Sequence, residues 1–71
     1  MSRKFSKDDL GNRLKDLRGE MSQEQCSKEL GISREAVSSY EQGRRRMNID
    51  TLFKFCIYFN VSADYILGIT D

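Results

Sequence analysis

The stretch from Ser22 to Gly43, SQEQCSKELGISREAVSSYEQG, decides the fold of this chain. It predicts two short helices joined by a tight turn at Gly31, because glycine in the left-handed conformation ends a helix without a steric penalty. Ser22 begins a capping box of the S-x-x-Q kind, and Ser33 can cap the second helix. Residues 22–42 are therefore predicted to form a helix-turn-helix.

The outward positions of the second predicted helix carry small polar and charged side chains. A helix-turn-helix can place this helix in the major groove of DNA while the first helix braces it. Arginine can donate two hydrogen bonds to guanine, glutamate can accept one from cytosine, and serine permits close approach. We therefore expect base contacts from Arg34, Glu35, Ser38 and Ser39. Alternatives stay open for both long side chains. Arg34 could instead bind a phosphate or be a plain surface residue, and Glu35 could repel phosphates or only interact favourably with the helix dipole.

Length and composition favour one small all-α domain. A chain of 71 residues has room for a single core, so residues 1–71 are treated as one domain. Proline is absent, glycine is sparse, and apolar residues recur at helical spacing. We expect a compact five-helix bundle.

Three further helices are predicted around the central pair. The first runs from a cap at Ser6 to Gly19, with three leucines on one face. The fourth starts at Asn48 or Asp50 and ends at Asn60. Its expected apolar face consists of Ile49, Leu52, Phe55, Cys56 and Phe59. A short fifth helix follows a cap at Ser62 and returns three apolar side chains to the core: Tyr65, Ile66 and Leu67.

The residue types exclude several classes of function. Histidine is absent, and the chain shows neither a nucleophile with a nearby base nor a phosphate-binding glycine loop, so we expect no catalysis and no cofactor. Cys26 and Cys56 lack metal-ligand spacing and are expected to be small core residues in a reducing compartment, without a metal. No apolar run is long enough for a membrane span and no signal-peptide pattern is visible, so we expect a cytoplasmic protein that does not bind membranes.

The formal net charge is only +1, but the basic residues are clustered. Arg44, Arg45 and Arg46 directly follow the second helix of the pair, where they would flank a groove occupied by that helix. A contact with phosphates is the interpretation we prefer, and a solvated loop is the alternative.

Five motifs occur in order along the chain: Leu17-Arg18, Ser22-Gln23, Leu30-Gly31-Ile32-Ser33, Tyr40-Glu41-x-Gly43 and Asn60-Val61-Ser62-x-Asp64-Tyr65-Ile66-Leu67. At these intervals they resemble the Cro and phage-repressor family of helix-turn-helix regulators, also called the xenobiotic-response-element type. The resemblance covers about residues 8–69. It implies a lambda-repressor-like DNA-binding domain.

The resemblance also assigns roles to individual residues. It implies that Arg18 and Glu41 form a structural ion pair beneath the DNA-binding surface. Phosphate contacts are expected at the start of each helix of the pair and in the loop that follows, from Gln23, Ser33, Arg44, Arg45 and Arg46. The outward residues of the second helix match positions that reach base edges in the family.

Apolar residues on the flank of the fourth predicted helix leave two alternatives open. Phe53 and Ile57 lie four residues apart and share a face, which would either widen the core stripe or form a surface for a partner. Ala63 and Asp64 are expected near the same surface. The second alternative is consistent with a dimer that binds a palindrome.

The function predicted from the sequence is sequence-specific binding of double-stranded DNA by a transcriptional regulator. We expect a repressor that binds a palindromic operator as a homodimer and acts by occluding a promoter. The alternative is an antitoxin-like or accessory helical module that acts mainly through a protein partner.

Overall fold

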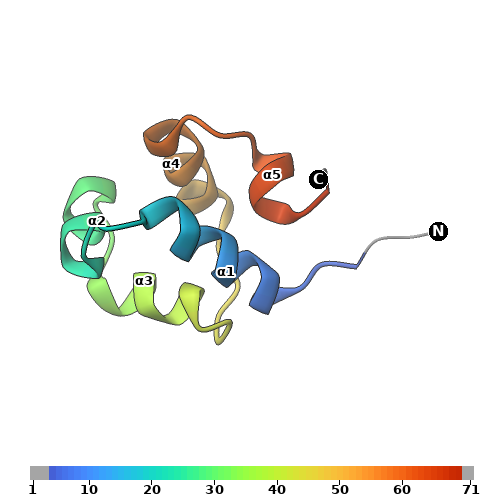
Figure 1. Ribbon diagram of the computed structural model, residues 1–71, viewed down its shortest axis with the longest axis horizontal. Coiled ribbons are helices and arrows are strands. Elements are labelled where there is room, and N and C mark those ends of the chain that lie inside the picture. Colours follow the sequence, from blue (N-terminus) through green and yellow to red (C-terminus); the bar gives the residue numbers. More distant parts are fainter. Residues whose placement is uncertain (1–3, 70–71) are drawn as a thin grey trace.

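The computed structural model describes residues 4–69, which form five helices and no strand (Figure 1). The helices are α1 (Lys7–Arg18), α2 (Gln23–Leu30), α3 (Arg34–Glu41), α4 (Ile49–Phe59) and α5 (Ala63–Leu67). The predicted all-α, five-helix bundle is therefore confirmed. The only notable difference in length is at α3, which ends at Glu41 and has Gln42 as its cap. None of the helices in the described range is long and apolar enough to cross a membrane.

Each helix starts with the same local arrangement. The side-chain oxygen of the cap accepts a hydrogen bond from the backbone N–H of the third helical residue, at 2.7–3.1 Å, and the caps are Ser6, Ser22, Ser33, Asn48 and Ser62. An apolar residue precedes every cap and another lies four positions after it, which is the pattern of a hydrophobic staple. The five pairs are Phe5 and Leu10, Met21 and Cys26, Ile32 and Val37, Met47 and Leu52, and Val61 and Ile66.

The core forms where these helices meet. α1 lies across the middle of the bundle and contacts both α3 and α5, α2 packs on α3, and α4 contacts α2 and α5 (Figure 1). The buried apolar side chains are Leu10, Leu14, Cys26, Leu30, Ala36, Val37, Tyr40, Phe55 and Ile66. Every helix contributes at least one of them, so displacement of any helix would expose core side chains.

Gly11 allows α3 to lie directly against α1. A Cβ atom at this position would lie 2.4 Å from the carbonyl oxygen of Glu41 and 2.7 Å from that of Tyr40, both on the backbone of α3. Such distances are far below van der Waals contact, so only glycine fits without a shift of the helices. This close approach fixes the C-terminal end of α3 against α1.

The predicted inner face of α4 was partly wrong. Ile49 was expected in the core, but 77% of its surface is exposed. The buried residues of α4 are Thr51 and Phe55, so the face that points inward is centred on these two positions. Ile49, Phe53 and Ile57 lie on the opposite side at spacings of four, and Phe53 and Ile57 are 65% and 66% exposed. The wider core stripe that was considered for Phe53 and Ile57 is therefore also wrong.

Candidate nucleic-acid interface

α2 and α3 form the predicted helix-turn-helix. α2 ends at Gly31, whose φ of 69° is left-handed, and the backbone N–H of Ile32 donates to the carbonyl of Ser27 across the turn. α3 buries Val37 and Tyr40 on its inner side. Its outer side is therefore free to face a ligand.

The four residues predicted to contact bases all lie on α3. Arg34 and Glu35 are exposed in its first turn. Ser38 and Ser39 are half-buried, and the hydroxyl of Ser38 accepts a hydrogen bond of 3.0 Å from the side-chain amide of Gln42. Their contacts with bases stay a prediction. Small side chains in the middle of the helix and long ones at its start leave room for another molecule to approach α3 closely.

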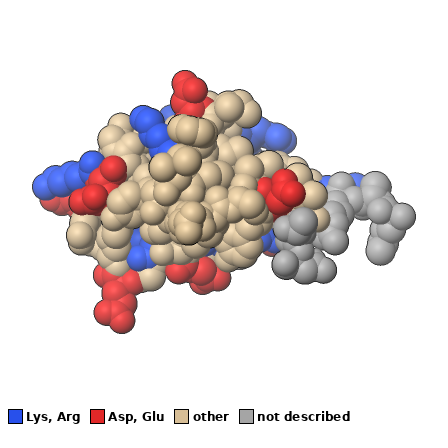
Figure 2. All heavy atoms as spheres, turned by 90° about the horizontal axis from the view of Figure 1, so that it is seen from above, with Lys and Arg blue, Asp and Glu red and all other residues tan. Residues whose placement is uncertain are grey.

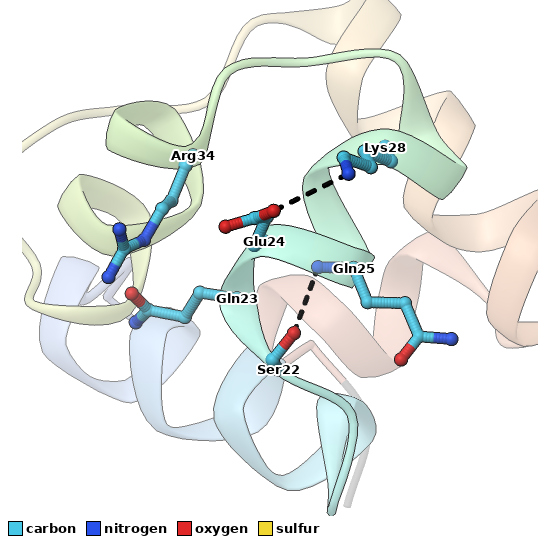
Figure 3. Close-up of a pocket in the computed structure, with 6 residues that line it drawn as sticks. All are labelled: Ser22, Gln23, Glu24, Gln25, Lys28 and Arg34. Atoms are coloured by element: carbon cyan, nitrogen blue, oxygen red, sulfur yellow. Dashed lines mark hydrogen bonds and ion pairs between the residues drawn. The ribbon is translucent and has the colours of Figure 1, made fainter.

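An open polar hollow lies between the N-terminal ends of α2 and α3. Figure 3 shows the side chains of Gln23, Glu24 and Arg34 extending into the same space from the two helices. Glu24 and Lys28 also line this hollow and were not predicted as site residues; the Lys28 ammonium lies 3.4 Å from the Glu24 carboxylate. Their spacing of four residues on one helix was the available signal. Because both side chains are exposed, this ion pair adds little stability.

Beneath this hollow a buried carboxylate joins three parts of the fold. Glu41 is 5% exposed and accepts two hydrogen bonds from Arg18, one from Nε at 2.6 Å and one from Nη2 at 3.0 Å. Arg18 also donates to the carbonyl oxygen of Met21 at 2.7 Å. The hydrogen bonding to Glu41 raises the pKa of Arg18 above its ordinary value, although burial opposes this shift. The ion pair implied by the family resemblance is therefore present, and it ties α1 to α3.

Gln23 belongs to the same network, which the sequence did not indicate. Its side-chain amide donates a hydrogen bond of 3.0 Å to Glu41. This contact fixes the Gln23 side chain and leaves its second amide N–H available for another acceptor. A phosphate contact by Gln23 stays a prediction.

The three arginines after α3 rest on three different supports. Arg44 Nη2 lies 3.4 Å from the hydroxyl of Ser39. The guanidinium of Arg45 lies 5.2 Å from the centre of the Tyr40 ring, and that of Arg46 lies 5.3 Å from the centre of the Phe5 ring. All three arginines are exposed. Phe5 was not predicted as a partner of Arg46. Its place before the Ser6 cap, with Leu10 four positions after the cap, indicated a hydrophobic staple but not this contact.

The cysteines show no arrangement for chemistry. Cys26 is buried, Cys56 is half-buried, and both thiols are free. Burial raises the pKa of the Cys26 thiol. In residues 4–69 no group of three or more Cys, Asp or Glu side chains is arranged to hold a metal ion.

Comparison with known proteins agrees with this geometry. The model of the helix-turn-helix family HTH_3 matches residues 14–66. This chain belongs to that family. The chain is 39% identical over 61 residues to the HTH-type transcriptional regulator ImmR of Bacillus subtilis (strain 168), and 34% identical over 61 residues to YobD of the same organism. Each alignment covers 83% of this chain but only 48% of ImmR and 54% of YobD, so the chain spans about half the length of these relatives.

Solved structures confirm the fold. The P22 c2 repressor, solved in complex with a synthetic operator, matches with a TM-score of 0.77 and 27% identity, over 82% of this chain and 91% of the repressor chain. The restriction-modification controller protein C.AhdI of Aeromonas hydrophila matches with a TM-score of 0.76 and 24% identity, over 84% of this chain and 94% of that one. The predicted lambda-repressor-like fold and the resemblance to phage repressors are therefore confirmed. The chain is a helix-turn-helix domain of the type found in transcriptional regulators.

Proposed function

We propose that this chain binds double-stranded DNA sequence-specifically as part of a transcriptional repressor. The observation that supports this most strongly is the outer side of α3, where exposed Arg34 and Glu35 lie on a helix held from behind by Val37 and Tyr40. The fold shared with the P22 c2 repressor, which was solved in complex with a synthetic operator, supports DNA as the ligand.

In the proposed complex α3 lies in the major groove. Arg34, Glu35, Ser38 and Ser39 face the base edges, where a bidentate arginine contributes about 1–3 kcal/mol of discrimination against a wrong base. Phosphate contacts flank the groove and come from Gln23, Ser33, Arg44, Arg45 and Arg46. A bound operator within a promoter then represses by blocking access of the transcription machinery.

Selection of binding sites from a random DNA pool tests this proposal. The wild-type chain should enrich one consensus and bind it much more tightly than random DNA. Arg34→Ala should lose sequence preference at one base position, because its contact is directional. Lys28→Ala is the matched control, since Lys28 lies in the same hollow and should leave the preference unchanged. Enrichment of no sequence by the wild-type chain would refute the proposal and turn the search towards a protein partner.

Arg45→Ala separates phosphate contacts from base contacts. Loss of one phosphate contact should weaken binding to all DNA sequences alike and reduce the slope of log K against log salt by about 0.9. A change confined to one base position would contradict a phosphate role for Arg45.

We further propose that the repressor acts as a two-fold dimer on a palindromic operator. The support is the outer face of α4, where Ile49, Phe53 and Ile57 form an exposed apolar line. Figure 2 views the side of α4 and α5 and shows a broad central area without charged side chains. Half-buried Ala63 and exposed Asp64, at the start of α5, complete the proposed dimer surface. Paired α3 helices would then read half-sites about 34 Å apart.

A further inference from the structure

Among the three arginines after α3, Arg46 alone is supported from a distant part of the sequence. Ser39 and Tyr40, which support Arg44 and Arg45, both belong to the preceding helix. Phe5, which supports Arg46, precedes α1. The support of Arg46 therefore depends on the tertiary fold and can be removed without altering α3.

Phe5 is itself held by the bundle. It lines an apolar hollow with Leu10 of α1, Met47 and Leu52 around the start of α4, and Leu67 of α5. Arg46 lines the same hollow, so the Phe5 and Arg46 side chains lie at one place on the surface of the bundle. Phe5 remains 42% exposed, which means that its replacement removes little of the core.

A guanidinium that lies over an aromatic ring keeps N–H donors available for another acceptor. The five N–H groups of arginine lie in the guanidinium plane, whereas an aromatic ring attracts the cation through its face. Arg46 over the Phe5 ring can therefore still donate to a phosphate. An arginine that is already held loses less side-chain freedom when it binds than one that moves freely in solvent.

We propose that Phe5 is a positioning residue for DNA binding, which holds the guanidinium of Arg46 in place for a phosphate contact. This inference rests on the proposed DNA-binding function. Phe5 does not touch DNA in this arrangement and acts only through Arg46. Its contribution must therefore vanish when Arg46 is absent.

A double-mutant cycle tests this dependence. Dissociation constants are measured for the selected consensus DNA with wild type, Phe5→Leu, Arg46→Ala and the double variant. Phe5→Leu keeps an apolar side chain in the hollow but removes the ring face, and it should weaken binding about 2–5-fold. In the Arg46→Ala background the same substitution should have no further effect. Phe5→Tyr, which retains the ring, should bind like wild type.

The salt dependence gives a second readout. Arg46→Ala should reduce the salt slope by about 0.9, because one phosphate contact is lost. Phe5→Leu should keep the wild-type slope while affinity falls, because the cation remains. Ile69→Ala is the matched control: Ile69 lines a neighbouring hollow with Phe5, and Arg46 does not line that hollow, so binding should be unchanged.

Two results would overturn the inference while leaving the proposed function intact. One is wild-type-like affinity of Phe5→Leu. The other is an equal loss from Phe5→Leu with and without Arg46, which would assign Phe5 a purely structural role. Failure of the wild-type chain to prefer any DNA sequence is a separate result, and it would refute both proposals.

Discussion

Glu41 is the buried residue that supports the candidate DNA-binding surface. Its carboxylate is buried and joins Arg18 of α1 to Gln23 at the start of α2. Removal of one partner from a buried ion pair leaves an uncompensated charge, which costs more than the pair itself contributes. The stability of the fold is therefore more sensitive to loss of Arg18 than to loss of both partners.

We expect Arg18→Met to destabilise the fold by about 3 kcal/mol, since the Glu41 carboxylate would stay buried without its cation. Urea unfolding followed by circular dichroism measures this change. The double variant Arg18→Met/Glu41→Leu should recover most of the loss, because no buried charge remains. A double variant less stable than the single one would contradict this account.

Cys26 gives the fold a defined response to alkaline pH. Burial raises the pKa of its thiol above the ordinary 9.0, so the folded chain keeps the proton at a pH where the unfolded chain releases it. The contribution to stability is complete below the unfolded pKa and is lost as pH rises towards the folded one. Unfolding free energies at about pH 8 and about pH 10 should differ less for Cys26→Ala than for wild type.

For individual residues, the sequence predicted which positions belong to the candidate site better than it predicted their contacts. Arg18 and Glu41 could be paired because a family resemblance implied it. The contacts of Gln23 with Glu41 and of Phe5 with Arg46 join residues far apart in the chain, and their existence depends on how the helices pack. Local patterns carry no information about such distances.

For the helices, the sequence predicted the number and the starting points far more accurately than it predicted contacts between single residues. Each helix begins with a polar cap between two apolar residues, and this arrangement is complete within six consecutive positions. Ile49 was misplaced because it lies in the first turn of α4, where apolar residues occur on both sides of the helix. Only the packing of Thr51 and Phe55 decides which side points inward.

Gly11→Ala should destabilise the bundle by about 1–3 kcal/mol, although alanine is the better helix former. The added methyl would meet the backbone oxygens of Glu41 and Tyr40, so α1 and α3 would have to separate. The midpoint of urea unfolding reports the change. Asn12→Ala, at the exposed neighbouring position, is the control and should be neutral or slightly stabilising. Equal effects of the two substitutions would show that the contact is not tight.

Ser33 has two separable roles at the start of α3. It caps the helix through the backbone N–H of Ala36, and it is proposed to contact a phosphate. Ser33→Ala should cost about 1 kcal/mol of stability through loss of the cap. Ser33→Asp should preserve stability, because aspartate also caps, yet weaken DNA binding by repelling phosphates. Unchanged DNA affinity of Ser33→Asp would place position 33 away from the DNA backbone.

For the whole molecule, the distribution of apolar surface says more about assembly than the net charge does. The sequence indicated an apolar flank on α4, but only the fold shows that Ile49, Phe53 and Ile57 share an exposed line. The line lies on a different helix from the candidate base contacts, so assembly and DNA reading can be tested independently.

Phe53→Glu should convert the proposed dimer into a monomer, because burial of a carboxylate in an apolar interface costs free energy. Sedimentation equilibrium measures the mass in solution. Lys15→Glu on α1 is the matched control, since it adds negative charge at an exposed site away from α4, and its mass should equal that of wild type. A wild-type chain that already sediments as a monomer would contradict the dimer without affecting the DNA-binding proposal.

The position of α1 has a consequence for how the molecule opens. α1 contacts both α3 and α5, so it links the part of the bundle that contains α2 and α3 to the part that contains α4 and α5 (Figure 1). Local unfolding of either part would expose the buried leucines of α1, because the contacts of α1 with the other part alone could not shield them from solvent. The bundle should therefore behave as a single cooperative unit, with the slowest-exchanging amide hydrogens of α1, α3 and α5 released by the same global unfolding.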